Sequence, residues 1–217
     1  MAWYKCIGSD SSKIIEKRYA RFTSAYGLRL PDKFGLNCFV DTGWNLSPKI
    51  VLKIFSTEYR DDTVYMHNNS SSPDSYSSLR EYNNKFYGSY GSSSVGMVNW
   101  SAGEHTYIEN DDDGYITFDG VQYRTFSPSN RTASRYLGPN RNQNAPLSPS
   151  EIEQKRSQVC LGYIMSLKIY DKNNNNELVF DVVPATFNNV PYLYDKVEKK
   201  LYYVPELMVT DTTPTIQ

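Results

Sequence analysis

Short runs of alternating apolar residues, each bounded by turn-forming residues, constrain the fold of this chain more than any other feature. Residues 49–55 place Ile50, Leu52 and Ile54 on one face, which is the period of a half-buried β-strand. A similar β-type run occupies residues 37–43. The chain is therefore expected to fold mainly as strands and turns.

A hairpin is the clearest local signal. The β-type runs Tyr115 to Phe118 and Val121 to Phe126 are separated only by Asp119-Gly120. Asp-Gly supplies the positive φ angles that a type I′ turn requires, so the pattern predicts two antiparallel strands. The last third of the sequence returns to such runs at residues 163–170, 177–183 and 200–204.

Two regions are less regular. Residues 61–94 are rich in Ser, Asn, Tyr and Gly, and we expect loops there with short strands at residues 63–66 and 85–88. Residues 127–146 are polar and rich in Asn, Pro and Arg, which predicts a surface excursion.

One helix is expected. Ser148-Pro-Ser-Glu151 combines a capping box with proline at the first helical position, which predicts a short helix that continues to about Gln158. Recurrent strands, a single short helix and the lack of βαβ alternation predict an all-β fold, an antiparallel two-sheet sandwich.

A chain of 217 residues is long enough for one such domain. The first residues carry alternating charge without a periodic apolar stripe, so we expect an N-terminal arm or attachment segment at residues 1–28. The sandwich domain is expected at residues 29–205, and an extended Thr/Pro-rich tail at residues 206–217.

The net charge and the start of the sequence limit the kinds of partner that we expect. The 23 basic and 24 acidic residues leave a net charge of -1, which argues against nucleic acid as a partner. The sequence lacks the start of a secretory signal, and no run approaches the roughly 18 apolar residues of a membrane span, so we expect a cytoplasmic site of synthesis and no membrane partner. Cys6, Cys38 and Cys160 lie far apart and are interpreted as free thiols.

Three parts of the chain share a pattern with a known family. Residues 165–171, 177–185 and 191–203 are similar to closing strands, Phe39 to Gly43 to a first strand with an Asp-Thr-Gly turn, and Ile116 to Val121 to a central hairpin. In this order they resemble the concanavalin A-like, laminin-G-type jelly-roll domains of phage virion and gut-bacterial surface proteins.

The resemblance covers residues 36–204 and implies a jelly-roll sandwich. It also implies a domain of the kind commonly appended to virion or cell-surface proteins. Residues 61–94 and 127–146 match nothing in the family pattern, so the family's loop-end ligand site is not transferred to particular residues.

Aromatic residues in the turn-rich regions are the candidate ligand-binding residues, since their rings stack on sugar rings. They are Trp44, Tyr76, Tyr82, Tyr87, Tyr90 and Trp100. The same side chains also suit a sheet core or a protein interface. Arg131, Arg135 and Arg141 are candidate partner-binding residues, with a solvated loop as the alternative.

The acidic segment Glu109 to Gly114 is a candidate metal site. Calcium suits several oxygen ligands on a tight turn, but the twelfth position counted from Glu109 is Gly120 rather than the glutamate of an EF-hand. We expect a solvated acidic turn, no metal and no cofactor.

Catalysis is not expected. A glycosidase needs two carboxylates across a cleft, and Glu151 and Glu153 fall in the predicted helix, where they face different ways. His67 and His105 lie apart from any evident nucleophile or metal ligand in the sequence.

The expected function is that of a bacteriophage virion structural or accessory protein: a capsid decoration, head-fibre or tail-associated protein. It would be made in the host bacterial cytoplasm, dock on other virion proteins and form a homo-oligomer. The alternative is a carbohydrate-binding adsorption module that recognises a host surface glycan.

Overall fold

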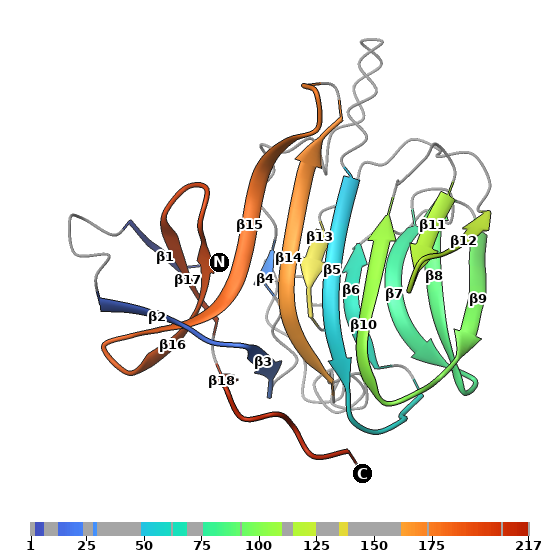
Figure 1. The fold of residues 1–217 in the computed structure, drawn as a ribbon, viewed down its shortest axis with the longest axis horizontal. Coiled ribbons are helices and arrows are strands. Elements are labelled where there is room, and N and C mark those ends of the chain that lie inside the picture. The colour runs from blue at the N-terminus through green and yellow to red at the C-terminus, as the bar shows by residue number, and fades with distance from the viewer. Residues whose placement is uncertain are drawn as a thin grey trace, which may run out of the picture.

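The computed structural model describes residues 3–6, 13–23, 28–29, 49–61, 63–68, 76–91, 93–109, 115–124, 135–138, 162–172, 174–204 and 206–216. These residues form eighteen strands in two antiparallel sheets (Figure 1). They include no α-helix, and so no helix of the length and hydropathy that crosses a membrane.

The larger sheet has a main path of nine strands. In spatial order they are β1 (Trp3–Cys6), β17 (Lys200–Tyr203), β16 (Val190–Asp195), β15 (Glu177–Phe187), β14 (Tyr163–Asp171), β5 (Lys49–Ser56), β10 (Gly103–Glu109), β11 (Tyr115–Phe118) and β12 (Val121–Arg124). Three further strands join it: β2 (Ile14–Glu16) pairs with β15, and β3 (Tyr19–Phe22) pairs with β14 and with β18 (Leu207–Thr210).

The smaller sheet faces the part of the larger one that runs from β14 to β12 (Figure 1). Its order is β4 (Leu28–Arg29), β13 (Arg135–Leu137), β6 (Val64–Asn68), β7 (Tyr76–Tyr82), β8 (Lys85–Gly91) and β9 (Ser93–Asn99). The two sheets confirm the predicted all-β fold, an antiparallel two-sheet sandwich of the jelly-roll kind.

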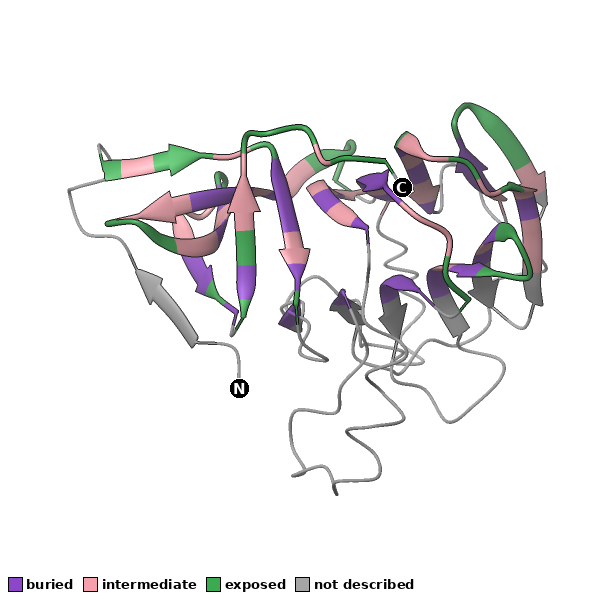
Figure 2. Ribbon diagram, turned by 90° about the horizontal axis from the view of Figure 1, so that it is seen from below, coloured by how far each residue is buried: buried purple, intermediate pink, exposed green. Residues whose placement is uncertain are grey.

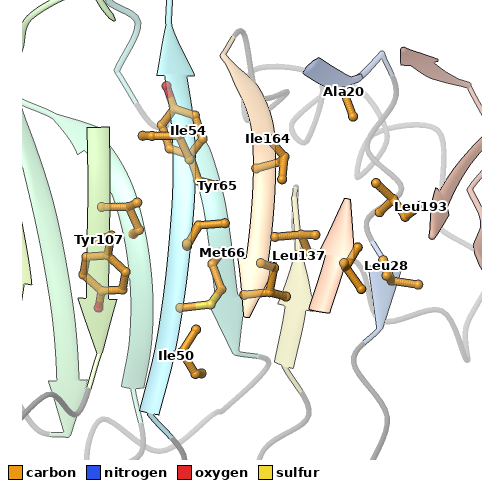
Figure 3. Close-up of a cluster of buried hydrophobic side chains, with 14 of the residues drawn as sticks. Ala20, Leu28, Ile50, Ile54, Tyr65, Met66, Tyr107, Leu137, Ile164 and Leu193 are labelled. Carbon is orange, nitrogen blue, oxygen red and sulfur yellow. The ribbon is translucent and has the colours of Figure 1, made fainter. Parts of the chain in front are cut away.

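The core lies between the facing sheets. Ile50, Leu52 and Ile54 of β5 are fully buried, as their alternation predicted, and β6 brings Tyr65 and Met66 to the same interior (Figure 3). Figure 2 shows the same alternation of buried and partly exposed positions along the strands. Each such side chain contributes about 1.5–3 kcal/mol on burial, so this interior stabilises the sandwich.

The predicted hairpin at residues 115–124 is confirmed. β11 pairs with β12, and the pair next to the turn is Phe118 opposite Val121. The turn residues Asp119 and Gly120 have φ angles of 49° and 81°, both positive as a type I′ turn requires.

The Ser- and Asn-rich region after residue 61 forms longer strands than predicted. Its inward positions carry large apolar side chains, among them Tyr65, Leu79 and Phe86, all with 0% exposure. Asn83 and Asn84 adopt positive φ angles of 49° and 57° and close the tight turn from β7 to β8. β6, β7 and β8 therefore form a continuous part of the smaller sheet, with asparagines in the β7–β8 turn.

The predicted surface excursion at residues 127–146 contains a strand, which corrects part of that prediction. β13 pairs with both β4 and β6, and its Leu137 is fully buried. Gly138 follows, and its amide donates to the Tyr65 carbonyl over 2.7 Å. Arg135 is thus a strand residue, because buried Leu137 draws this segment into the smaller sheet.

The N-terminal segment differs from the separate arm that we expected at residues 1–28. Within it, β2 and β3 pair with the larger sheet, and Tyr19, Ala20 and Phe22 are almost completely buried. The charged residues Arg18 and Arg21 between and beside them hide this apolar pattern in the sequence.

The C-terminal segment also contributes to the sheet. Residues 206–217 were expected as an extended tail, but β18 pairs with β3 over four residue pairs, from Leu207 opposite Phe22 to Thr210 opposite Tyr19. Lys17 Nζ donates to Asp211 Oδ2 over 2.7 Å just beyond this pairing. The described parts of both ends therefore lie side by side.

Several sequence predictions lie outside the described residues. Among them are the first strand at residues 37–43, the helix at residues 148–158, and the thiols of Cys38 and Cys160.

Candidate functional site

The candidate site lies at one end of the sandwich, where β5, β7 and β9 end and β8 and β10 begin. Gly103 of β10 is opposite Ser56 of β5, and Lys85 of β8 is opposite Asn99 of β9. In Figure 1 this is the lower end of the sandwich. The register brings the segment after β5, the β7–β8 turn and Trp100 together.

Two aromatic rings and three polar residues form the surface of this end, and we call them the Trp100 site: Tyr59, Asp61, Asn83, Asn84 and Trp100. The rings of Tyr59 and Trp100 are half-buried and meet edge to face, with centroids 6.0 Å apart. Asp61, Asn83 and Asn84 are exposed. The site thus combines apolar ring surface with amide and carboxylate groups.

Main-chain hydrogen bonds hold these residues together. The Trp100 amide donates to the Asn84 carbonyl over 2.9 Å, and the Asn84 amide donates to Tyr59 Oη over 2.6 Å. The Asn83 amide donates to Asp61 Oδ1 over 2.8 Å. Three separate chain segments are therefore joined into one surface.

Tyr59 completes this network as a donor to Asp61 Oδ1. Burial raises the pKa of Tyr59, and its hydrogen bond to Asp61 and the charge of that carboxylate act in the same direction, against the Asn84 amide. The hydroxyl therefore stays protonated and continues to donate.

A buried carboxyl group lies beneath the surface. Glu81 has 0% exposure, and its Oε1 accepts from Tyr65 Oη over 2.6 Å and from Ser56 Oγ over 2.8 Å. Its Oε2 accepts from the Arg60 amide over 3.2 Å. Burial raises the pKa of Glu81, and the hydrogen bonds that it accepts oppose the shift.

Ser56 links this carboxyl to the surface. Trp100 Nε1 donates to Ser56 Oγ over 2.9 Å, and the same Oγ donates to Glu81. Gly162 leaves room for the cluster, because a Cβ there would lie 2.3 Å from Tyr65 Oη. The indole is thus fixed from the interior of the protein.

Two of the predicted ligand-binding tyrosines meet on the outer face of the smaller sheet. Tyr82 is 43% exposed, and its ring meets Tyr87 edge to face with centroids 5.6 Å apart. The Arg80 guanidinium lies 5.0 Å from the Tyr82 ring centroid. Tyr87 packs on Gly96, where a Cβ would lie 3.1 Å from the ring.

The structure brings together only part of the predicted set. Trp100 is in the site, and Tyr82 directly precedes Asn83 and Asn84. Tyr76 and Tyr90 lie on β7 and β8, towards the opposite end of their hairpin from Tyr82. Trp44, Arg131 and Arg141 lie outside the described residues, and Arg135 lies on β13.

Sequence reasoning missed six residues of this region: Ser56, Tyr59, Asp61, Glu81, Asn83 and Asn84. Two of them had a readable signal. Ser56 continues the inward face of Ile50, Leu52 and Ile54, and Glu81 follows Leu79 by two residues. A polar residue that continues an apolar face is a candidate for a buried functional group.

His105 is paired, although it appeared isolated in the sequence. Its Nδ1 lies 2.7 Å from Asp119 Oδ2, and its Nε2 lies 2.9 Å from the Ser101 carbonyl oxygen. A Ser-His-Asp triad requires a serine hydroxyl at the second nitrogen, and here that nitrogen faces a main-chain carbonyl. His105 therefore ties β10 to the β11–β12 turn.

Metal ligands do not gather in the part of the chain that the structure describes, where no three His, Cys, Asp or Glu side chains could hold an ion. Of the acidic segment considered for calcium, Glu109 is fully buried at the end of β10. Residues 110–114 lie outside the described residues.

Comparison with known proteins finds similarity among solved structures. No known protein family matches the chain, and no curated protein matches it in sequence. Among solved structures, domains LG4-5 of the mouse laminin alpha1 chain match with a TM-score of 0.43 and 13% identity over 74% of this chain. The match covers 42% of the laminin chain, so this chain spans less than half of its length. The fold assignment rests on the strand order described above.

Proposed function

We propose that this protein is a non-catalytic binding module whose Trp100 site recognises a glycan of a host cell surface. The observation that carries the proposal is the fixed pair of aromatic rings beside exposed polar groups at the end of the sandwich. A pyranose presents apolar C–H faces and a rim of hydroxyls, and this site offers a partner for each.

The polar part of the site is held in place before any ligand binds. Asn83 and Asn84 are anchored through their main-chain groups, so their exposed side-chain amides remain available as donors and acceptors. A surface that is already ordered loses less conformational freedom on binding. This supports recognition of a small polar ligand.

The non-catalytic part of the proposal is supported by the two carboxyl groups of the region. Glycoside hydrolysis uses two carboxylates that both reach the scissile bond. Glu81 is fully buried, with both oxygens engaged by donors, and Asp61 is held by Tyr59 and the Asn83 amide. Neither arrangement suits proton transfer to a bound sugar.

The test is a titration with methyl glycosides of glucose, galactose and N-acetylglucosamine, followed by NMR on the indole N–H of Trp100. We expect at least one glycoside to shift this resonance, and Trp100→Ala, which lacks the indole and is titrated by calorimetry, to bind about tenfold or more weakly than the unmodified protein. Tyr203→Ala removes an exposed tyrosine on β17 and is the matched control.

Trp100 also packs against the core, so Trp100→Phe is the second variant, which keeps an aromatic ring without the indole N–H. Circular dichroism would confirm that each variant is folded. Absence of any response to all three glycosides, or unchanged affinity in Trp100→Ala, would contradict the proposal.

A second candidate function is a structural or accessory role in a phage virion, in which a homo-oligomer docks on other virion proteins. Exposed apolar side chains on three strands favour it: Ile15 of β2, Val190 of β16 and Met208 of β18. Exposed apolar side chains are what a docked partner would bury.

For this role we expect the double variant Ile15→Asp with Met208→Asp to fold but to lose incorporation into purified particles, as measured by mass spectrometry. Lys17 offers a polar control position nearby, as Lys17→Gln. Equal copy numbers for the double variant and the unmodified protein would exclude docking through these residues.

A further inference from the structure

We propose that Glu81 is the positioning residue of the Trp100 site and holds both arms of that site through hydrogen bonds to Ser56 and to the Arg60 amide. The first arm is Trp100, and the second is the segment that carries Tyr59 and Asp61. The inference deepens the proposed glycan-binding function and rests on it for the role of the two arms.

The first arm depends on the direction of the Ser56 hydroxyl. An ionised carboxylate only accepts hydrogen bonds, so the single proton of Ser56 Oγ is directed to Glu81 Oε1 at 2.8 Å. The lone pairs of Oγ are then free to accept from Trp100 Nε1 at 2.9 Å. Glu81 thereby sets the hydroxyl that fixes the indole.

The second arm depends on the other carboxyl oxygen. Glu81 Oε2 accepts from the Arg60 amide over 3.2 Å, and Arg60 stands directly between Tyr59 and Asp61. One carboxyl group accepts hydrogen bonds that hold both arms. Glu81 therefore sets the distance between the indole and the Tyr59–Asp61 segment from the interior side of the site.

The surroundings of Glu81 contain few titratable groups. Tyr65 of β6 donates to it, and Tyr59, Arg60 and Asp61 belong to the segment above it. Its register partner on β8 is Phe86, and Gly162, just before β14, faces Tyr65. Neither of these two residues brings a charge close to Glu81. His105 lies beyond Phe86, with ring centroids 4.7 Å apart.

Packing alone does not explain a glutamate at this position. Leu79 occupies the preceding inward position of the same strand and is fully buried, so packing in this interior does not require a polar side chain. A buried carboxyl group is costly to desolvate, and apolar replacement of buried charged groups is often neutral or stabilising. A carboxyl group at this position accepts hydrogen bonds from three donors on three chain segments, which an apolar side chain cannot do.

Two substitutions separate the arms. Ser56→Ala removes the acceptor of the indole N–H and leaves the Arg60 contact in place. Glu81→Gln keeps the shape and an oxygen for Ser56 and Tyr65, but places an amide nitrogen where the Arg60 amide needs an acceptor. Ser78→Ala is the matched control, because Ser78 is buried on the same strand and its hydroxyl has no hydrogen-bond partner among the described residues.

The readout is the indole N–H resonance of Trp100 in the full-length protein, assigned by its loss in Trp100→Phe. We expect Ser56→Ala to accelerate hydrogen exchange of this group about tenfold or more, since a partly buried donor loses its partner. In the unmodified protein the resonance should shift in one step as Glu81 titrates, and Glu81→Gln should abolish that step. Ser78→Ala should change neither.

Affinity for the methyl glycosides completes the test. We expect both Ser56→Ala and Glu81→Gln to bind about tenfold more weakly than Ser78→Ala. An unchanged indole resonance and unchanged exchange in both variants would overturn the inference, whether or not a glycoside binds. A response of the indole without any glycoside binding would support Glu81 as the positioning residue of Trp100 and contradict the proposed function.

Discussion

The middle of the sandwich and its Trp100 end are built from the same strands but are held together in different ways. Along β5, the buried positions Ile50, Leu52 and Ile54 are followed by buried Ser56, and along β7 buried Leu79 is followed by buried Glu81. In the middle, burial of apolar area provides stability without strict direction. At the Trp100 end, hydrogen bonds fix the orientation of the side chains. One strand therefore contributes stability along one stretch and the geometry of the site along another.

The largest effect on stability is expected in the middle. Leu52→Ala should reduce the free energy of unfolding by about 2–5 kcal/mol, because Leu52 is fully buried opposite Leu167 and Tyr107 and its removal leaves a cavity. Urea unfolding measures the change. Glycoside affinity of the folded fraction should stay the same, and a coupled loss of affinity would show that the two regions are not independent.

The next largest effect is expected beneath the site. Gly162→Ala would place a Cβ 2.3 Å from Tyr65 Oη, so the phenol ring must move and the network around Glu81 with it. We expect about 1–3 kcal/mol of destabilisation, measured by thermal unfolding, together with a shifted Trp100 indole resonance. Gly96→Ala is the comparison variant, since its Cβ would lie 3.1 Å from the tip of the Tyr87 ring on the outer face. It should leave the indole resonance unchanged.

A third effect depends on pH. Because burial raises the pKa of Glu81 in the folded state, the folded protein binds this proton more tightly than the unfolded chain. The stabilisation is complete below the unfolded pKa and is lost as pH rises through the folded pKa. The free energy of unfolding of the unmodified protein should thus rise relative to Glu81→Gln as the pH falls through the folded pKa of Glu81, and a tenfold difference in proton affinity corresponds to about 1.4 kcal/mol.

The pH dependence is measured by urea unfolding at each pH. A difference between the two proteins that does not change with pH would show that Glu81 has its ordinary pKa. In that case Glu81, at the Trp100 end, would titrate like a carboxyl group on the solvated surface.

The smallest effect is expected for an exposed ion pair that belongs to neither region. Lys196 Nζ lies 2.9 Å from Glu16 Oε2, and both side chains are largely exposed. Lys196→Ala should change the free energy of unfolding by about 0–1 kcal/mol, and less in high salt. A larger loss would mean that the attachment of β2 to the sheet contributes more than its geometry indicates.

Much of the fold could be predicted because its signals are local. The alternation of Ile50, Leu52 and Ile54 and the Asp119-Gly120 turn each specify a strand or a hairpin from neighbouring residues alone. The N-terminal strands could not be predicted in this way. Tyr19, Ala20 and Phe22 become buried only because β14 and β18, from the far end of the sequence, pair with β3.

The site was less predictable than the fold for the same reason. Trp100 was selected for its ring, but Ser56 and Glu81 acquire their meaning from the registers that bring β5, β7 and Trp100 together. Tyr82 and Tyr87 were selected with it, and they form their own pair on the outer face. Side-chain chemistry indicated ligand binding, while only the register could show which residues act together.

The pairing of β3 with β18 has a consequence for the order in which the protein is made. On the ribosome, β3 emerges among the first strands, and its partners β14 and β18 are among the last. Until they emerge, the rings of Tyr19 and Phe22 have no interior to enter, so the nascent chain carries an exposed apolar segment. Contacts so distant in sequence also slow folding, and this protein should therefore need protection from aggregation until β14 and β18 have emerged.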